Sequence, residues 1–189
     1  MKKLIFGCGA GIFFFFSPAV LSSVHAQSGC SGVYLSADDL AAGRLISCVK
    51  PHRSDNVMNS KYFFIQQNGA VKKLGRKDLY AVKYCDGRVF RVFGDGFFAW
   101  LNPGEAIPLY EVVENPVAKG NICRTEYYFS KDARSAIQQL TRDNVKAAFA
   151  GDAKFEEALD LQFGSDRDLY AYDSYNKCYR LDRVYAICK

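Results

Sequence analysis

Histidine is the scarcest acid–base residue of this 189-residue sequence, which contains only two, His25 and His52. A metal site built from several histidines is therefore excluded, and no acidic run has the spacing of a calcium-binding loop. The sequence also lacks Cys-x-x-Cys, Gly-x-Ser-x-Gly and a glycine-rich phosphate loop, so the thioredoxin-like, hydrolase-like and nucleotide-binding signatures are missing. No cofactor and no catalytic residue are predicted.

The first 26 residues have the pattern of a secretory signal peptide. A basic start, Met1-Lys2-Lys3, precedes an apolar run from Leu4 to Phe16, and small residues stand at the usual cleavage offsets. We expect cleavage between Ala26 and Gln27. The protein is therefore predicted to be exported, to the periplasm or to the medium.

Two other interpretations of the leader are less favoured. An uncleaved anchor needs about 20 apolar residues, and Pro18 with the serines around it argues against one, so no stable membrane span is expected after cleavage. Lipid attachment at Cys8 is disfavoured because too few apolar residues precede that cysteine.

Removal of the leader changes the cysteine count from seven to six. An even number in an oxidising compartment permits disulfides, and six thiols allow 15 pairings, among which the sequence does not choose. The candidate disulfide cysteines are Cys30, Cys48, Cys85, Cys123, Cys178 and Cys188.

The charge of the mature chain is mild. Without Lys2 and Lys3 it has 23 basic and 20 acidic residues, a net charge of +3, which is too small and too dispersed to predict nucleic-acid binding. One basic cluster, Lys72-Lys73-Leu74-Gly75-Arg76-Lys77, follows a turn signal. It is interpreted as the solvated rim of a hairpin.

Between residues 44 and 140, short apolar runs alternate with turn dipeptides. Asn68-Gly69, Asp86-Gly87 and Asp95-Gly96 each separate two such runs, and these dipeptides tolerate the positive φ of two-residue hairpin loops. A two-residue loop at Asp86-Gly87 places Val82 opposite Arg91. Because side chains alternate across a strand, both faces of this predicted meander are apolar and need cover.

After Thr141 the apolar period changes to between three and four. Thr141 is predicted to cap a short helix that Gly151 ends, and a second helix begins near Ala153. The segment 165–168 resembles a capping box, from which a last helix is predicted to extend almost to the C-terminus. In one continuous helix, Cys178 and Cys188 would lie about 15 Å apart, too far to bond.

These patterns predict a single α+β domain over residues 27–189. An antiparallel β meander of about six to eight strands occupies residues 30–140. Two or three C-terminal helices, within residues 141–189, pack on the sheet.

The loop-like stretch around His52 contains two short signatures. Ser47-Cys48-Val49-Lys50 and Ser54-Asp55-Asn56 fit motifs of the penicillin-binding and serine β-lactamase families. That chemistry needs the serine at the start of a helix, whereas Ile46 and Val49 indicate a strand, so this interpretation is set aside. His52 is predicted to be a solvated loop residue.

Aromatic residues are abundant, with 12 tyrosines, 15 phenylalanines and one tryptophan. Exposed rings could stack on sugars or pack on a partner. The simpler interpretation is that alternating aromatics fill the core of a sheet.

Three segments, 128–132, 139–149 and 175–180, resemble exported bacterial proteins known mainly as hypothetical. The resemblance implies export and brings neither an activity nor a functional residue.

The sequence therefore predicts an exported bacterial protein that acts as a non-enzymatic binding or structural module, with a partner in the periplasm or cell envelope. Two alternatives stay open. One is a secreted hydrolase whose site is assembled from dispersed residues near His52. The other is a thiol/disulfide redox protein, which needs an exposed cysteine with a depressed pKa.

Overall fold

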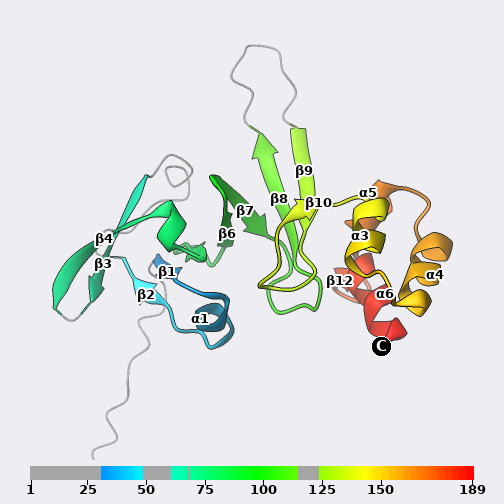
Figure 1. Ribbon diagram of the computed structural model, residues 1–189, viewed down its shortest axis with the longest axis horizontal. Helices are drawn as coiled ribbons and strands as arrows, with labels where there is room; N and C mark the ends of the chain where they lie inside the picture. The colour runs from blue at the N-terminus through cyan, green and yellow to red at the C-terminus, as the bar shows by residue number, and fades with distance from the viewer. Residues whose placement is uncertain (1–30, 49–60, 68, 115–123) are drawn as a thin grey trace, which may run out of the picture.

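The computed structural model describes residues 31–48, 61–67, 69–114 and 124–189. Figure 1 shows a central sheet between a β-hairpin at one end of the molecule and a group of helices at the other. The predicted α+β class and antiparallel meander are confirmed. The predicted leader lies outside the described residues.

The large sheet has eight antiparallel strands, each of two to six residues. They are β1 (Gly32–Tyr34), β2 (Ile46–Ser47), β5 (Ala81–Lys83), β6 (Val89–Phe93), β7 (Gly96–Trp100), β8 (Leu109–Glu114), β9 (Arg124–Phe129) and β10 (Gln138–Gln139). The spatial order is β10-β9-β8-β7-β6-β5-β1-β2. The strands from β5 to β10 thus form the meander, and β1 and β2 extend it.

The hairpin of β3 (Tyr62–Gln67) and β4 (Ala70–Gly75) is a separate two-stranded sheet. Gln67 pairs with Ala70, which confirms the predicted two-residue loop. The hairpin does not join the meander. A continuous meander would pair β4 with β5, whereas in the structure β1 is the partner of β5. An isolated bridge between Cys48 and Ile65 connects it to the end of the large sheet.

The register between β5 and β6 differs from the prediction by one residue. Val82 pairs with Phe90, whereas the prediction placed it opposite Arg91. The reason is a three-residue loop: the Tyr84 N–H donates to the Arg88 carbonyl over 2.9 Å. A one-residue shift moves every side chain of a strand to the other face, so Val82 shares its face with Phe90, and the predicted pairing with Arg91 was wrong.

The turn between β6 and β7 is also displaced. Phe93 pairs with Gly96, so the two loop residues are Gly94 and Asp95, and the predicted Asp95-Gly96 loop was wrong. Gly94 has a φ of +58°, as the first central position of a type II′ turn requires. This shift is by two residues, so the side chains keep their faces.

Both faces of the large sheet are covered. On one face, the β3–β4 hairpin covers the β5–β6 end with Phe63, Ile65 and Leu74, and the C-terminal helices cover the β8–β9 end. On the other face, Ala133 and Ile137 pack with the first helix against Trp100 and its neighbours. One row of cross-strand partners runs across the first face: Val33, Val82, Phe90, Ala99, Glu111 and Tyr127.

The helices follow local capping signals. The Thr141 Oγ1 accepts from the Asn144 N–H over 3.2 Å, and the Ser165 N–H donates to Asp168 Oδ2 over 2.8 Å, so both predicted caps are confirmed. The helical segments are α1 (Ala37–Ala41), the 3-10 helix η1 (Arg76–Asp78), α3 (Arg142–Ala148), α4 (Ala153–Gln162), α5 (Asp166–Leu169) and α6 (Arg180–Cys188). None of these is long and apolar enough to cross a membrane.

The predicted continuous last helix was wrong. It stops after α5, and a small hairpin of β11 (Tyr172–Asp173) and β12 (Cys178–Tyr179) precedes α6. The Asp173 carboxylate accepts from the N–H groups of Tyr175 and Asn176, and Lys177 has a φ of +54°. Such local side-chain bonds offer the backbone an alternative to a helix. Cys178 and Cys188 therefore do not share one helix.

Candidate functional site

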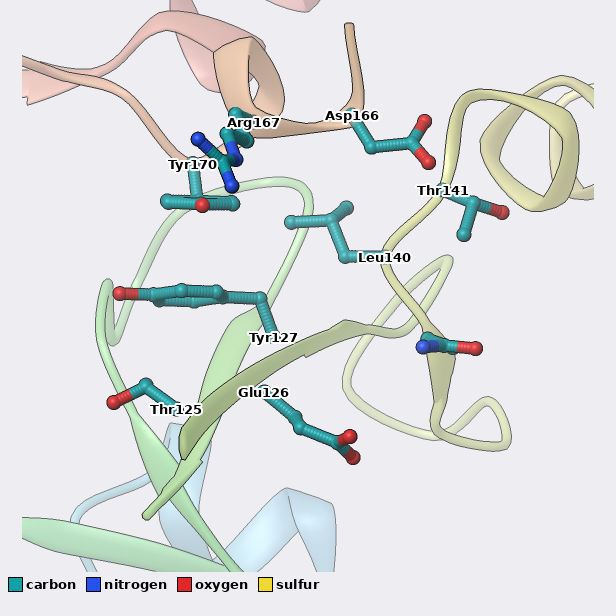
Figure 2. A pocket seen from close by; sticks show the side chains of 9 residues that line it. Thr125, Glu126, Tyr127, Leu140, Thr141, Asp166, Arg167 and Tyr170 are labelled. Atoms are coloured by element: carbon teal, nitrogen blue, oxygen red, sulfur yellow. The ribbon is translucent and has the colours of Figure 1, made fainter. Parts of the chain in front are cut away.

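A hollow of about 190 Å³ lies where the large sheet meets the helices (Figure 2). Its walls come from β9, from the end of β10 with the segment that leads to α3, and from α5 with the residue that follows it. The lining residues are Thr125, Glu126, Tyr127, Gln139, Leu140, Thr141, Asp166, Arg167 and Tyr170.

Two stacked tyrosines form the aromatic wall of the hollow. The rings of Tyr127 and Tyr170 lie 3.7 Å apart between centroids and 11° from parallel, as Figure 2 shows. Two isolated rings prefer offset or edge-to-face arrangements. The surrounding structure therefore holds this pair in place.

Each tyrosine is positioned by a buried neighbour. Tyr127 ends the cross-strand row on β9, two residues before the fully buried Phe129. Tyr170 follows Leu169, which is fully buried among the helices. The site thus joins an element of the sheet to the short helix α5, and its geometry depends on the packing of both.

The polar groups of the hollow differ in how far they are already bonded. Thr141 caps α3, and Asp166 Oδ1 accepts from the Arg142 N–H over 2.8 Å. Arg167 is exposed and forms no hydrogen bond or ion pair with any residue that the structure describes; in Figure 2 its guanidinium lies beside the Tyr170 ring. Arg167 is therefore the charged group most available to a ligand.

Burial acts on the phenol of Tyr127. Desolvation raises the pKa of Tyr127, and the nearby Glu111 carboxylate raises it further. The hydroxyl stays protonated at neutral pH and can donate or accept a hydrogen bond.

The hollow does not contain the groups of a nucleophilic catalytic site. Its lining holds no serine, cysteine, histidine or lysine. Its two carboxylates already accept hydrogen bonds: Glu126 Oε2 accepts from the Tyr128 hydroxyl over 2.8 Å, and Asp166 Oδ1 accepts from the Arg142 N–H. Within the described part of the chain, no three His, Cys, Asp or Glu side chains cluster as metal ligands would.

A larger hollow of about 540 Å³ lies at the start of α4, and its groups are already bonded to one another. Lys189 Nζ donates to Asp152 over 2.6 Å and also covers the Tyr185 ring. Lys131 covers the ring of Phe149. A ligand there would have to displace these contacts, so the smaller hollow is the better candidate.

The described cysteines lie away from the hollow. Cys48 is buried beneath the β3–β4 hairpin, and the exposed Cys85 lies in the loop after β5, where its Sγ accepts from the Ser31 N–H over 3.0 Å. Cys178 is on β12, and Cys188 ends α6. No disulfide joins two of these four. Cys30 and Cys123 lie outside the described residues, so the disulfide hypothesis stays a prediction.

A redox role finds no support at Cys178. Burial raises the pKa of the Cys178 thiol, and the carboxylates of Asp173 and Asp182 raise it further. A thiol that exchanges disulfides needs the opposite, a pKa depressed by positive charge or a helix N-terminus.

Several predicted positions are not described by the structure. They are His52 and the cleavage site at Ala26 and Gln27. Ser47 is described, and it lies in strand β2. This strand agrees with the argument that set the penicillin-binding motif aside.

The stacked tyrosines were not found from the sequence. Tyr127 and Tyr170 belong to different halves of the chain, one in the predicted sheet and one in the predicted helical tail. The abundance of tyrosine was the only signal. Composition alone does not say which rings meet.

Comparison of the chain with protein-family models, with curated proteins and with solved structures finds no match. The site is therefore interpreted from its own geometry.

Proposed function

We propose that this protein is a non-enzymatic binding module of the bacterial cell envelope and that it holds a saccharide unit in the hollow beside Tyr127 and Tyr170. The face-to-face pair of tyrosines is the observation that carries this proposal: each ring covers one face of the other, so a sugar would contact the edges and the outer faces of the stack. Sugar rings present C–H groups to aromatic faces and hydroxyl oxygens to the positive ring edges.

The other lining groups suit the same ligand class. Thr125 supplies a hydroxyl, Gln139 an amide, and Arg167 a guanidinium whose donors are not engaged by described residues. Neutral hydroxyl groups of a sugar bond to donors and acceptors of this mixed kind. The volume of about 190 Å³ is below the range usual for whole ligand pockets, so the hollow would hold one unit of a longer glycan.

Binding is favoured over hydrolysis because of the two carboxylates. A glycoside hydrolase places its acid and its second carboxylate on either side of one bond, about 5 to 10 Å apart. Glu126 and Asp166 each accept a hydrogen bond from the protein. These bonds support a structural role for both carboxylates.

Calorimetric titration with an N-acetylglucosamine oligomer and with a maltose oligomer tests the proposal. We expect weak, measurable binding of at least one probe. Tyr170→Ala should weaken it about tenfold through lost stacking, whereas Tyr170→Phe should retain most of it.

Tyr175→Ala is the matched control, because Tyr175 is 91% exposed and lies outside the hollow. Equal effects of the two alanine variants would contradict the proposed site. Absence of binding by both oligomers would contradict the saccharide class, and turnover of either would contradict the non-enzymatic role.

A further inference from the structure

The outward side of the β3–β4 hairpin carries apolar side chains that no other described part of the chain covers. Tyr62, Phe64 and Val71 are 48%, 38% and 61% exposed. Their neighbours on the inward side, Phe63 and Leu74, are buried. Because side chains alternate along a strand, the buried side fixes the hairpin to the sheet, and the outward side faces away from it.

The same hairpin is strongly basic. Residues 61–77 contain five cations and neither aspartate nor glutamate, so this segment has the same net charge as the whole chain, +5. The four lysines, Lys61, Lys72, Lys73 and Lys77, are exposed and form no ion pair with the residues that the structure describes.

We propose that this outward surface docks on the anionic headgroups of a lipid bilayer. Each lysine near an anionic membrane surface contributes about 1 kcal/mol of attraction. Tyrosine and phenylalanine favour the headgroup level, where a ring can be partly buried while polar groups stay in water. Lys73 shares the outward face with these side chains, because it pairs with Phe64, whereas the exposed Lys72 pairs with Ile65 and starts from the other face. Both lysines belong to a hairpin that lies at the opposite end of the molecule from the helices that border the hollow (Figure 1).

The arrangement of the rings favours lipid over single-stranded nucleic acid. Nucleic acid binds such surfaces by stacking its bases on open aromatic faces. Here Lys73 Nζ lies 3.5 Å from the centroid of the Tyr62 ring and covers one of its faces. Val71, the most exposed of the three apolar side chains, offers no surface for stacking and can be buried among lipid headgroups.

Sedimentation with lipid vesicles tests the proposal. The protein, produced with its leader and recovered after export, is mixed with vesicles of phosphatidylcholine alone or of phosphatidylcholine with phosphatidylglycerol. We expect binding to the anionic vesicles only, weakened by added salt because exposed charges are screened. The double variant Lys72→Glu/Lys73→Glu should lower the affinity at least tenfold.

Lys131→Glu/Lys154→Glu changes the net charge equally and lies outside the hairpin, so it should bind like the parent protein. Phe64→Ser should weaken binding severalfold without altering its salt dependence. If the glutamate variant does not fold, as judged by circular dichroism, Lys72→Gln/Lys73→Gln replaces it, with an expected loss of about tenfold.

Three results would overturn the proposal. These are equal binding to both vesicle types, equal losses in the hairpin variant and its control, and binding to single-stranded DNA without binding to anionic vesicles. Saccharide binding uses the other end of the molecule, so Tyr170→Ala should leave vesicle binding intact, and the two proposals can fail separately.

Discussion

The two ends of the large sheet bury the same kind of surface and present different ones to solvent. At one end the β3–β4 hairpin packs Phe63 and Ile65 on the sheet, and at the other the helices pack Phe155 and Leu159 on the same face. All four side chains are fully buried. The hairpin and the helices therefore both bury large apolar side chains completely against the sheet.

Their outer surfaces differ in how charge is compensated. At the helical end, Asp160 is shared by Arg142 and Lys146, and Asp152 pairs with Lys189. On the hairpin, the lysines have no such partners among the described residues. A surface whose charges are paired attracts a charged partner only weakly. A basic surface with exposed rings attracts an anionic partner. The hairpin is therefore the end for which we propose docking, and the helical end borders the hollow.

The largest expected effect is at the core of the helical end. Phe155 is fully buried and its ring contacts those of Phe149 and Tyr185. Phe155→Ala should lower the free energy of unfolding by about 3–5 kcal/mol, because a large cavity is left. Urea denaturation measures this. Leu161→Ala, in the same helix at 77% exposure, is the control and should change it by less than about 0.5 kcal/mol.

Neighbouring phenylalanines on β3 test the hairpin in the same way. Phe63 is fully buried and Phe64 is 38% exposed, so Phe63→Ala should cost about 3 kcal/mol and Phe64→Ala less than about 1 kcal/mol. If the two ends form one cooperative unit, circular dichroism and Trp100 fluorescence will report the same transition for Phe63→Ala. Separate transitions would show that the hairpin unfolds independently.

A buried carboxylate makes the stability of the helical end depend on pH. Asp182 is 6% exposed; its Oδ2 accepts from Asn102 Nδ2 over 2.7 Å, and its Oδ1 has no hydrogen-bond partner in the described structure. Burial raises the pKa of Asp182 to about 6, against the lowering effect of the Asn102 bond.

The sign follows from proton linkage. The folded state holds this proton more tightly than the unfolded state, where the aspartate pKa is about 3.9. Stability is therefore highest below about pH 4 for this group and falls as the pH rises to about 6. Asp182→Asn should remove that dependence and raise stability at neutral pH by about 1 kcal/mol, measured as urea midpoints from pH 4 to 8. A variant that kept the parent pH profile would contradict this assignment.

The sequence predicts the local features of this protein better than its long-range ones. The caps at Thr141 and Ser165 and the loop between β3 and β4 were correct, because capping and turn chemistry depend on a few adjacent residues. The register at Val82 was wrong because Asp86-Gly87 fits both a two-residue loop and a three-residue loop with glycine at its last position. Only the packing of the completed sheet distinguishes them.

The candidate site depends on contacts that no local pattern encodes. Tyr127 and Tyr170 meet because the last predicted helix breaks, and that break depends on Asp173 and Lys177 in a turn that the apolar period conceals. The basic run 72–77 was recognised in the sequence. Its association with exposed rings required knowledge of which face of β3 is buried.

The smallest expected effect concerns the ion pairs that distinguish the helical surface from the hairpin. Lys146 hydrogen-bonds to Asp160, and this contact, with a second from Arg142, lowers the pKa of Asp160. Because that carboxylate is at the surface, solvent screens the gain. Asp160→Asn should shift the urea midpoint downward by less than any variant above, and added salt should reduce the shift.

Glu157→Gln removes an exposed carboxylate of the same helix that has no partner among the described residues, and should have no measurable effect. If Asp160→Asn has an effect as large as Phe63→Ala, the surface charges of the helical end stabilise the fold as strongly as its core. The paired charges of the helical surface would then differ from the hairpin lysines in their contribution to stability as well as in their proposed role in docking.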